Sequence, residues 1–137
     1  MPRGMRVRLL RQTAFMHHGV PKAYAGKQST APKGPATTAA GRRIYAENCA
    51  SCHGETGLGN GEAGHPLSPS PALLAYMIRR PIAVDEYLLW TISEGGAQFG
   101  SEMPAFKDRL GSEDIWRVVA CMRVGFPPVD AAPQPKN

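Results

Sequence analysis

Cys49, Cys52 and His53 stand together in the short stretch CASCH of this 137-residue chain. Three chemistries use a Cys-x-x-Cys pair. A thioredoxin-like redox pair needs a βαβ setting, and no strand pattern surrounds this one. A structural zinc site needs four ligands at suitable spacing, whereas here there are three, two of them adjacent and crowded. The third chemistry is covalent haem attachment, in which two thiols add across the vinyl groups and the next residue supplies an axial imidazole.

Helical spacing brings these groups to one side. The sequence predicts a helix over about residues 39–53, in which Tyr45, Cys49, Cys52 and His53 stand at i, i+4, i+7 and i+8. One helical face can then hold both thiols and the imidazole. A large, flat, apolar cofactor would also replace the core that a loop-rich chain lacks.

A haem iron bound to one imidazole needs a sixth ligand or keeps an open position, and that choice separates electron transfer from ligand chemistry. Met103 is the candidate that differs from the rest, because it stands in the irregular stretch GSEMPAF, where Pro104 stiffens the backbone behind it. Its thioether is soft, suits reduced iron and raises the reduction potential. Two methionines on apolar helix faces are more typical of core packing. These and the remaining candidates are Met77, Met122, His65, His17 and His18.

Three further helices are predicted around these residues. One begins at Ser70 and ends before Pro81, a second spans about residues 84–94 and ends at two glycines, and a third runs from Ser112 towards Gly125. Long irregular stretches separate them, and no strand pattern competes. The expected fold class is all-α, with about four helices and long loops.

Charge and composition divide the chain into three parts. Residues 1–38 carry seven basic side chains and no acidic one, and they show no sustained apolar period, so we expect a basic, mostly irregular leader or tether. Residues 39–126 carry eight basic and ten acidic side chains and form the expected domain. Residues 127–137 are expected to be a disordered, proline-rich tail. Because the excess positive charge belongs to the leader, nucleic-acid binding is not predicted.

The leader raises two further expectations. It has no apolar run long enough for a membrane helix, and its charged start lacks the apolar core of a signal peptide. Met16, His17 and His18 stand together in it, and one hypothesis makes them a structural or copper-handling module.

Two separate motifs resemble one family. GRRIYAENCASCHGETGLGNG is similar to the first helix and haem-attachment turn of class I c-type cytochromes, the small bacterial monohaem electron carriers, and MPAFKDRLGSEDIWRVVACMR is similar to their methionine loop and last helix. The resemblance covers about residues 39–126. It implies a cytochrome c-like fold around one covalently attached haem c. Cys49 and Cys52 would form the thioethers, His53 would be the proximal iron ligand and Met103 the distal one.

The resemblance also implies packing. Gly41 and Tyr45 match the glycine and the aromatic residue of the first helix that pack against the last helix. Cys121 stands where the family commonly has an aromatic residue, and we expect it to be a buried, inert thiol. A proline carbonyl should accept the N–H of the proximal histidine. Spacing alone does not choose among the candidate prolines, which are Pro66, Pro69 and Pro71.

The implied function is single-electron transfer between redox partner proteins, without enzymatic activity of the chain's own. The alternative is a haem-based ligand binder, sensor or peroxidase-like protein with an open sixth position, which requires Met103 to be off the iron. The family attaches its haem after export, so the expected location is periplasmic or membrane-anchored on the periplasmic side, with any anchor upstream of residue 1. The expected state is a monomer or a subunit of a larger oxidoreductase.

Overall fold

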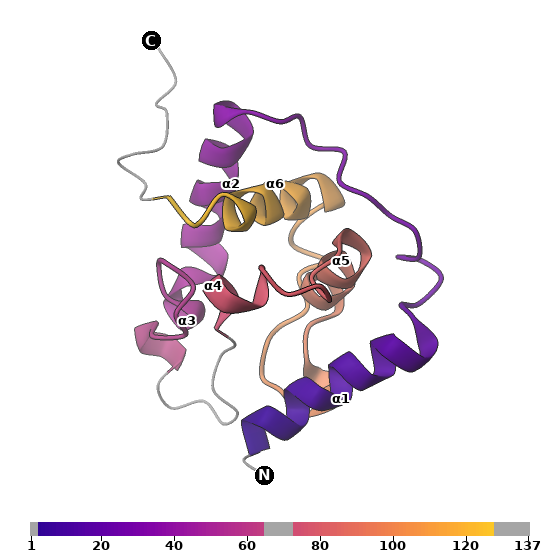
Figure 1. The fold of residues 1–137 in the computed structure, drawn as a ribbon. Helices are drawn as coiled ribbons and strands as arrows, with labels where there is room; N and C mark the ends of the chain where they lie inside the picture. Colours follow the sequence, from indigo (N-terminus) through magenta and orange to yellow (C-terminus); the bar gives the residue numbers. More distant parts are fainter. Residues whose placement is uncertain (1–2, 65–72, 128–137) are drawn as a thin grey trace.

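The structure is a computed structural model that describes residues 3–64 and 73–127. Within these ranges the regular elements are all helical and no strand occurs, which confirms the all-α fold class (Figure 1). In chain order they are α1 (Arg3–His18), α2 (Pro35–Asn48), α3 (Ala50–His53), the 3-10 turn η1 (Glu62–Gly64), α4 (Leu74–Met77), α5 (Asp85–Glu94), the 3-10 turn η2 (Ala97–Phe99) and α6 (Ser112–Arg123).

The crossing of α2 and α6 is the most extensive contact between helices (Figure 1). Gly41 lies at the crossing, and a Cβ atom there would overlap the backbone carbonyl of Arg117. Only a residue without a side chain lets the two backbones approach so closely. Tyr45 is fully buried one turn further on, and its ring meets that of Phe126 edge-on at 5.2 Å. The expected packing of Gly41 against the last helix is confirmed.

Cys121 is also fully buried in this core. Burial raises the pKa of its thiol to about 11, and the guanidinium of Arg42 partly offsets the rise. A thiol with so high a pKa stays protonated and unreactive at neutral pH, as expected.

Sequence patterns located the helices with mixed success. The expected helices at 84–94 and from Ser112 are confirmed as α5 and α6. The expected continuous helix over 39–53 is wrong in detail, because the backbone leaves helical geometry at Cys49, between α2 and α3. The helix expected from Ser70 is represented by the single turn α4, and its expected start lies outside the described residues.

Within the expected leader, residues 3–18 form the 16-residue helix α1, which the sequence did not predict. The sequence of α1 has no apolar period that would predict a helix. Contacts of individual side chains with the rest of the molecule therefore hold α1 in place. The ring of Phe15 packs edge-on against Tyr87 of α5 at 5.0 Å between centroids. Figure 1 shows α1 along one flank, with the following segment passing around the molecule to α2.

The segment after α1 is fastened to α5 as well. The backbone N–H groups of Gly26 and Ser29 donate to the carboxylates of Glu86 and Asp85, at 2.7 and 2.9 Å. The hydroxyl of Tyr24 makes a short hydrogen bond to Glu94 at the other end of α5. The leader therefore follows α5 from end to end.

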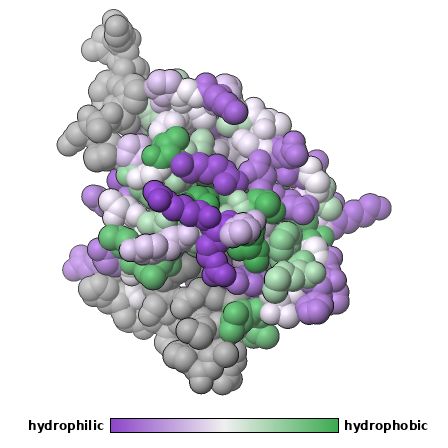
Figure 2. Space-filling view, viewed as in Figure 1, coloured by the Kyte–Doolittle hydropathy of each residue, from purple (hydrophilic) through white to green (hydrophobic). Residues whose placement is uncertain are grey.

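No described helix combines the length and the apolar character needed to cross a bilayer. In the view of Figure 2, hydrophilic residues are spread over the surface and apolar residues form separate patches between them. The exposed large apolar side chains include Leu58, Leu73, Tyr76, Val84 and Val124.

Candidate functional site

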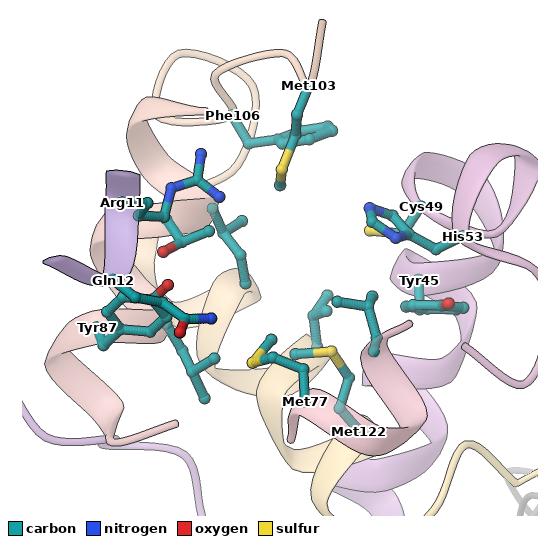
Figure 3. A pocket seen from close by; sticks show the side chains of 15 residues that line it. Arg11, Gln12, Tyr45, Cys49, His53, Met77, Tyr87, Met103, Phe106 and Met122 are labelled. Carbon is teal, nitrogen blue, oxygen red and sulfur yellow. The ribbon is translucent and has the colours of Figure 1, made fainter. Parts of the chain in front are cut away.

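A cavity of about 730 Å³, including its open mouth, lies between the helices, and its lining is mostly apolar (Figure 3). Helices α1 to α6 and the loop that carries Met103 and Phe106 all contribute to its wall. The lining residues are Arg11, Gln12, Tyr45, Cys49, His53, Leu74, Met77, Tyr87, Leu88, Thr91, Ile92, Met103, Phe106, Val118 and Met122.

The turn that carries the CASCH motif is held from within the chain. Cys49 caps both α2 and α3, and its carbonyl accepts the N–H of His53 at 2.9 Å. The hydroxyl of Tyr45 donates to the carbonyl of Gly54 at 2.6 Å in the buried interior. This bond ties α2 to the residue after His53, so the backbone is held on both sides of His53.

The glycine-rich stretch after His53 acts as a clasp on α3. The N–H of Gly59 donates to the carbonyl of His53 at 2.7 Å, and the N–H of Gly61 donates to that of Cys52 at 3.1 Å. These bonds satisfy carbonyl groups that a short helix leaves without partners at its end. A Cβ at Gly61 would collide with the backbone of Ser51, so the close approach requires glycine.

Met103 is held in a comparable way at the end of α5. Its carbonyl accepts the N–H of Gly96 at 3.1 Å, and its own N–H donates to the hydroxyl of Ser101 at 3.1 Å. Three residues later, the N–H of Phe106 donates to the carbonyl of Ile92 in α5 at 3.1 Å. The loop around Met103 is therefore anchored on both sides.

Figure 3 shows how these groups face one another. The sulfur of Met103 hangs into the cavity from one side, and the imidazole of His53 enters from another, with Cys49 beside it. Met77 and Met122 lie together at a third side. Three of the methionines considered as sixth ligands thus reach the same cavity, but only Met103 comes from a loop.

Burial governs the ionisable groups of the wall. It raises the pKa of the Cys49 thiol to about 12, with smaller contributions from Cys121 and Cys52, and it raises the pKa values of the Tyr45 and Tyr87 hydroxyls. It also lowers the pKa of the Arg11 guanidinium. The cavity is thus a setting of low polarity in which neutral groups and thioethers are favoured.

The structure brings three of the four predicted site residues to the cavity. Cys49, His53 and Met103 line it, whereas Cys52 is half-buried and is not among the lining residues. The break at Cys49 explains the difference, because it separates two positions that a continuous helix would place on one face. Among the described residues, no group of three His, Cys, Asp or Glu side chains is placed to hold a metal ion.

The other candidates fall elsewhere. Met16, His17 and His18 are exposed at the end of α1 and do not line the cavity. His65 and the three candidate prolines, Pro66, Pro69 and Pro71, lie outside the described residues.

Sequence reasoning missed several cavity residues. Tyr87, Thr91 and Ile92 stand on one face of α5, and their helical spacing was a signal that could have indicated a wall. Arg11 and Gln12 come from α1, where no apolar period marks an inner face. No sequence signal could have assigned these two to the site.

The residues present fit a haem. The cavity combines an apolar wall with a thiol, an imidazole and a thioether, which are the groups that attach and ligate this cofactor. Fold and site together define a class I c-type cytochrome with covalently bound haem c. The chain belongs to the family described as cytochrome c oxidase, cbb3-type, subunit III, whose model matches residues 36–122.

Curated relatives are also named as subunits of a cbb3-type oxidase. The chain is 40% identical over 58 residues to the Cbb3-type cytochrome c oxidase subunit FixP of Rhizobium meliloti, covering 42% of this chain and 17% of the relative. It is 38% identical over 78 residues to that of Bradyrhizobium diazoefficiens, covering 56% and 23%. The matches thus span about a fifth of the length of these relatives. No solved structure matches the chain.

Proposed function

We propose that this protein carries single electrons through a haem attached by Cys49 and Cys52 and ligated by His53 and Met103. The observation that carries the proposal is the convergence of His53 and Met103 on one apolar cavity from two separately anchored segments, the short helix α3 and the loop after η2 (Figure 3). The bound haem would supply an iron that changes its oxidation state by one electron. The unit responsible would be residues 39–126, close to the range that the family model matches.

Anchored ligands suit this function. The carbonyl of His53 is clasped by Gly59, and Met103 is bonded through both its N–H and its carbonyl. The chain therefore holds both side chains in place whatever the charge on the iron, so little rearrangement accompanies each transfer. Met103 would also raise the reduction potential, because a thioether favours the reduced iron.

The family description suggests a redox partner for this chain. Its description and the names of the FixP relatives refer to subunits of a cbb3-type oxidase. We propose that this chain passes electrons to or within such an oxidase and is not itself the site of its catalysis. Covalent attachment of haem after export would place the protein on the periplasmic side.

Carbon monoxide distinguishes this function from ligand chemistry at an open iron. The reduced holo-protein should not bind carbon monoxide, because Met103 occupies the sixth position. The Met103→Leu variant should bind it and show the corresponding Soret shift, and Met77→Leu is the matched control, since it removes another methionine from the same wall. Immediate carbon monoxide binding by the unaltered protein would overturn the proposal in favour of a sensor or peroxidase-like protein.

A further inference from the structure

Helix α1 lies outside the range that the family model matches, yet it forms part of the cavity wall. Arg11 and Gln12 come from this helix and line the cavity. Phe15, one turn later, packs on Tyr87, which lines the same wall. The helix is therefore placed with its polar residues facing a largely apolar space.

The guanidinium of Arg11 is only partly satisfied. Its Nη2 donates to the carbonyl of Gly95 at 2.9 Å, and its Cζ lies 5.3 Å from the ring centroid of Phe99. Its Nε is buried and has no hydrogen-bond partner. Among the described residues no carboxylate pairs with it. A half-buried cation with a buried, unpaired N–H donor costs free energy, so a negatively charged group on the cavity side would stabilise it.

Haem itself supplies such a group. Its two propionate carboxylates lie on the edge opposite the vinyl groups, and the vinyl groups are the ones that cysteine thiols attack. Figure 3 shows Cys49 and Arg11 on opposite sides of the cavity. A ring anchored at Cys49 would therefore direct its carboxylate edge towards α1.

We infer that Arg11 binds a haem propionate, with the amide of Gln12 beside it, so that α1 completes the haem site. An arginine fork matches a carboxylate better than any other side chain, and Nε is one of the donors it presents. The inference rests on the proposed attachment of the haem at Cys49. It gives the leader a part in the site in place of a role as a tether.

The reduction potential reports this contact. A cation beside a propionate disfavours the ferric form, which carries one more positive charge than the ferrous form. Spectroelectrochemical titration of the full-length holo-protein should therefore show a lower potential in Arg11→Leu. We expect the redox equilibrium to shift by roughly tenfold, which is about 59 mV for one electron.

Arg109→Leu is the matched control. Its guanidinium lies 5.0 Å from the ring of Phe106, which lines the cavity, but the side chain is exposed. The control removes the same charge and the same kind of ring contact without removing a cavity donor. Its equilibrium should shift by less than about twofold, because solvent screens an exposed charge. Arg11→Lys should recover part of the potential, since it keeps the charge and loses the fork.

The propionate bending band in resonance Raman spectra gives a second, structural readout. It should move in Arg11→Leu and stay in place in Arg109→Leu.

Equal potentials in these two variants, or an unmoved propionate band in Arg11→Leu, would show that Arg11 only supports the fold. If Arg11→Leu does not retain haem, Arg11→Lys and Gln12→Leu are compared in the same way, and an unmoved propionate band in both overturns the inference. Failure here leaves Met103 ligation intact, so it is distinguishable from failure of the proposed function.

Discussion

The two flanks of the cavity are built in different ways. On one flank α2 and α6 cross backbone to backbone at Gly41, over a buried core that includes Tyr45. On the other flank α1 is held by individual side chains, among them Arg11 and Phe15. The first contact depends on residue types at fixed helical spacing. The second depends on a few long side chains that contact α5 and the segment directly after it. A c-type cytochrome needs the first to fold, whereas the second can adjust the site.

The largest effect should come from the helix crossing. Gly41→Ala places a methyl group on the carbonyl of Arg117, so the helices must separate, and we expect a loss of about 3 kcal/mol in the free energy of unfolding. Urea unfolding of the ferric holo-protein measures it. Gly111→Ala is the control, because a Cβ there meets no atom within 4 Å, and it should cost less than about 1 kcal/mol. Equal losses would show that the crossing is not tight.

The anchor of α1 should have a smaller and local effect. Phe15→Ala removes the ring that packs on Tyr87, and we expect α1 to open about tenfold more often, equivalent to about 1.4 kcal/mol. Amide hydrogen exchange should rise in α1 and stay unchanged in α6. Met16→Ala is the control, since Met16 is 70% exposed. If α6 exchanged faster as well, the two flanks would be one cooperative unit and the distinction between them would fail.

The smallest expected change in stability comes from the carboxylate of Glu94, and it should depend on pH. Hydrogen bonds from Tyr24 and Lys107 lower the pKa of Glu94 below its ordinary value of 4.5. A carboxylate with a lowered pKa stabilises the folded state above its ordinary pKa, and this contribution is lost as the pH falls through the lowered value. Glu94→Gln should therefore cost about 1 kcal/mol or less at pH 7 and nothing well below pH 4. Thermal unfolding of both proteins between about pH 3 and pH 7 measures this difference in stability. A difference that persists at low pH would exclude the ionised carboxylate as its cause.

Much of the domain could be predicted because haem chemistry and helix packing demand particular residues. Cys49, Cys52 and His53 are readable as a set, and Gly41 is readable from its place before them. The break at Cys49 was not predictable, because neither a glycine nor a proline marks that point in the sequence. Tertiary contacts override local periodicity at such points.

The leader could not be predicted for a related reason. The helix α1 has no apolar period, and its stability comes from contacts with α5 that are distant in sequence. Arg11 reads as one more solvated charge in a basic segment until its partner, the carbonyl of Gly95, is known. Side-chain contacts of this kind carry no spacing rule, so only the structure reveals them.

Iron ligation by Met103 is best tested on the three methionines of the cavity wall. Ferric haem bound to methionine has a near-infrared charge-transfer band, which can be recorded for Met103→Leu, Met77→Leu and Met122→Leu in the full-length holo-protein. Leucine keeps the bulk of the side chain and cannot ligate iron, so the series separates ligation from packing. We predict that the unaltered protein shows the band and that Met103→Leu alone loses it. A band that survives in Met103→Leu, or that disappears in either of the other variants instead, would contradict ligation by Met103.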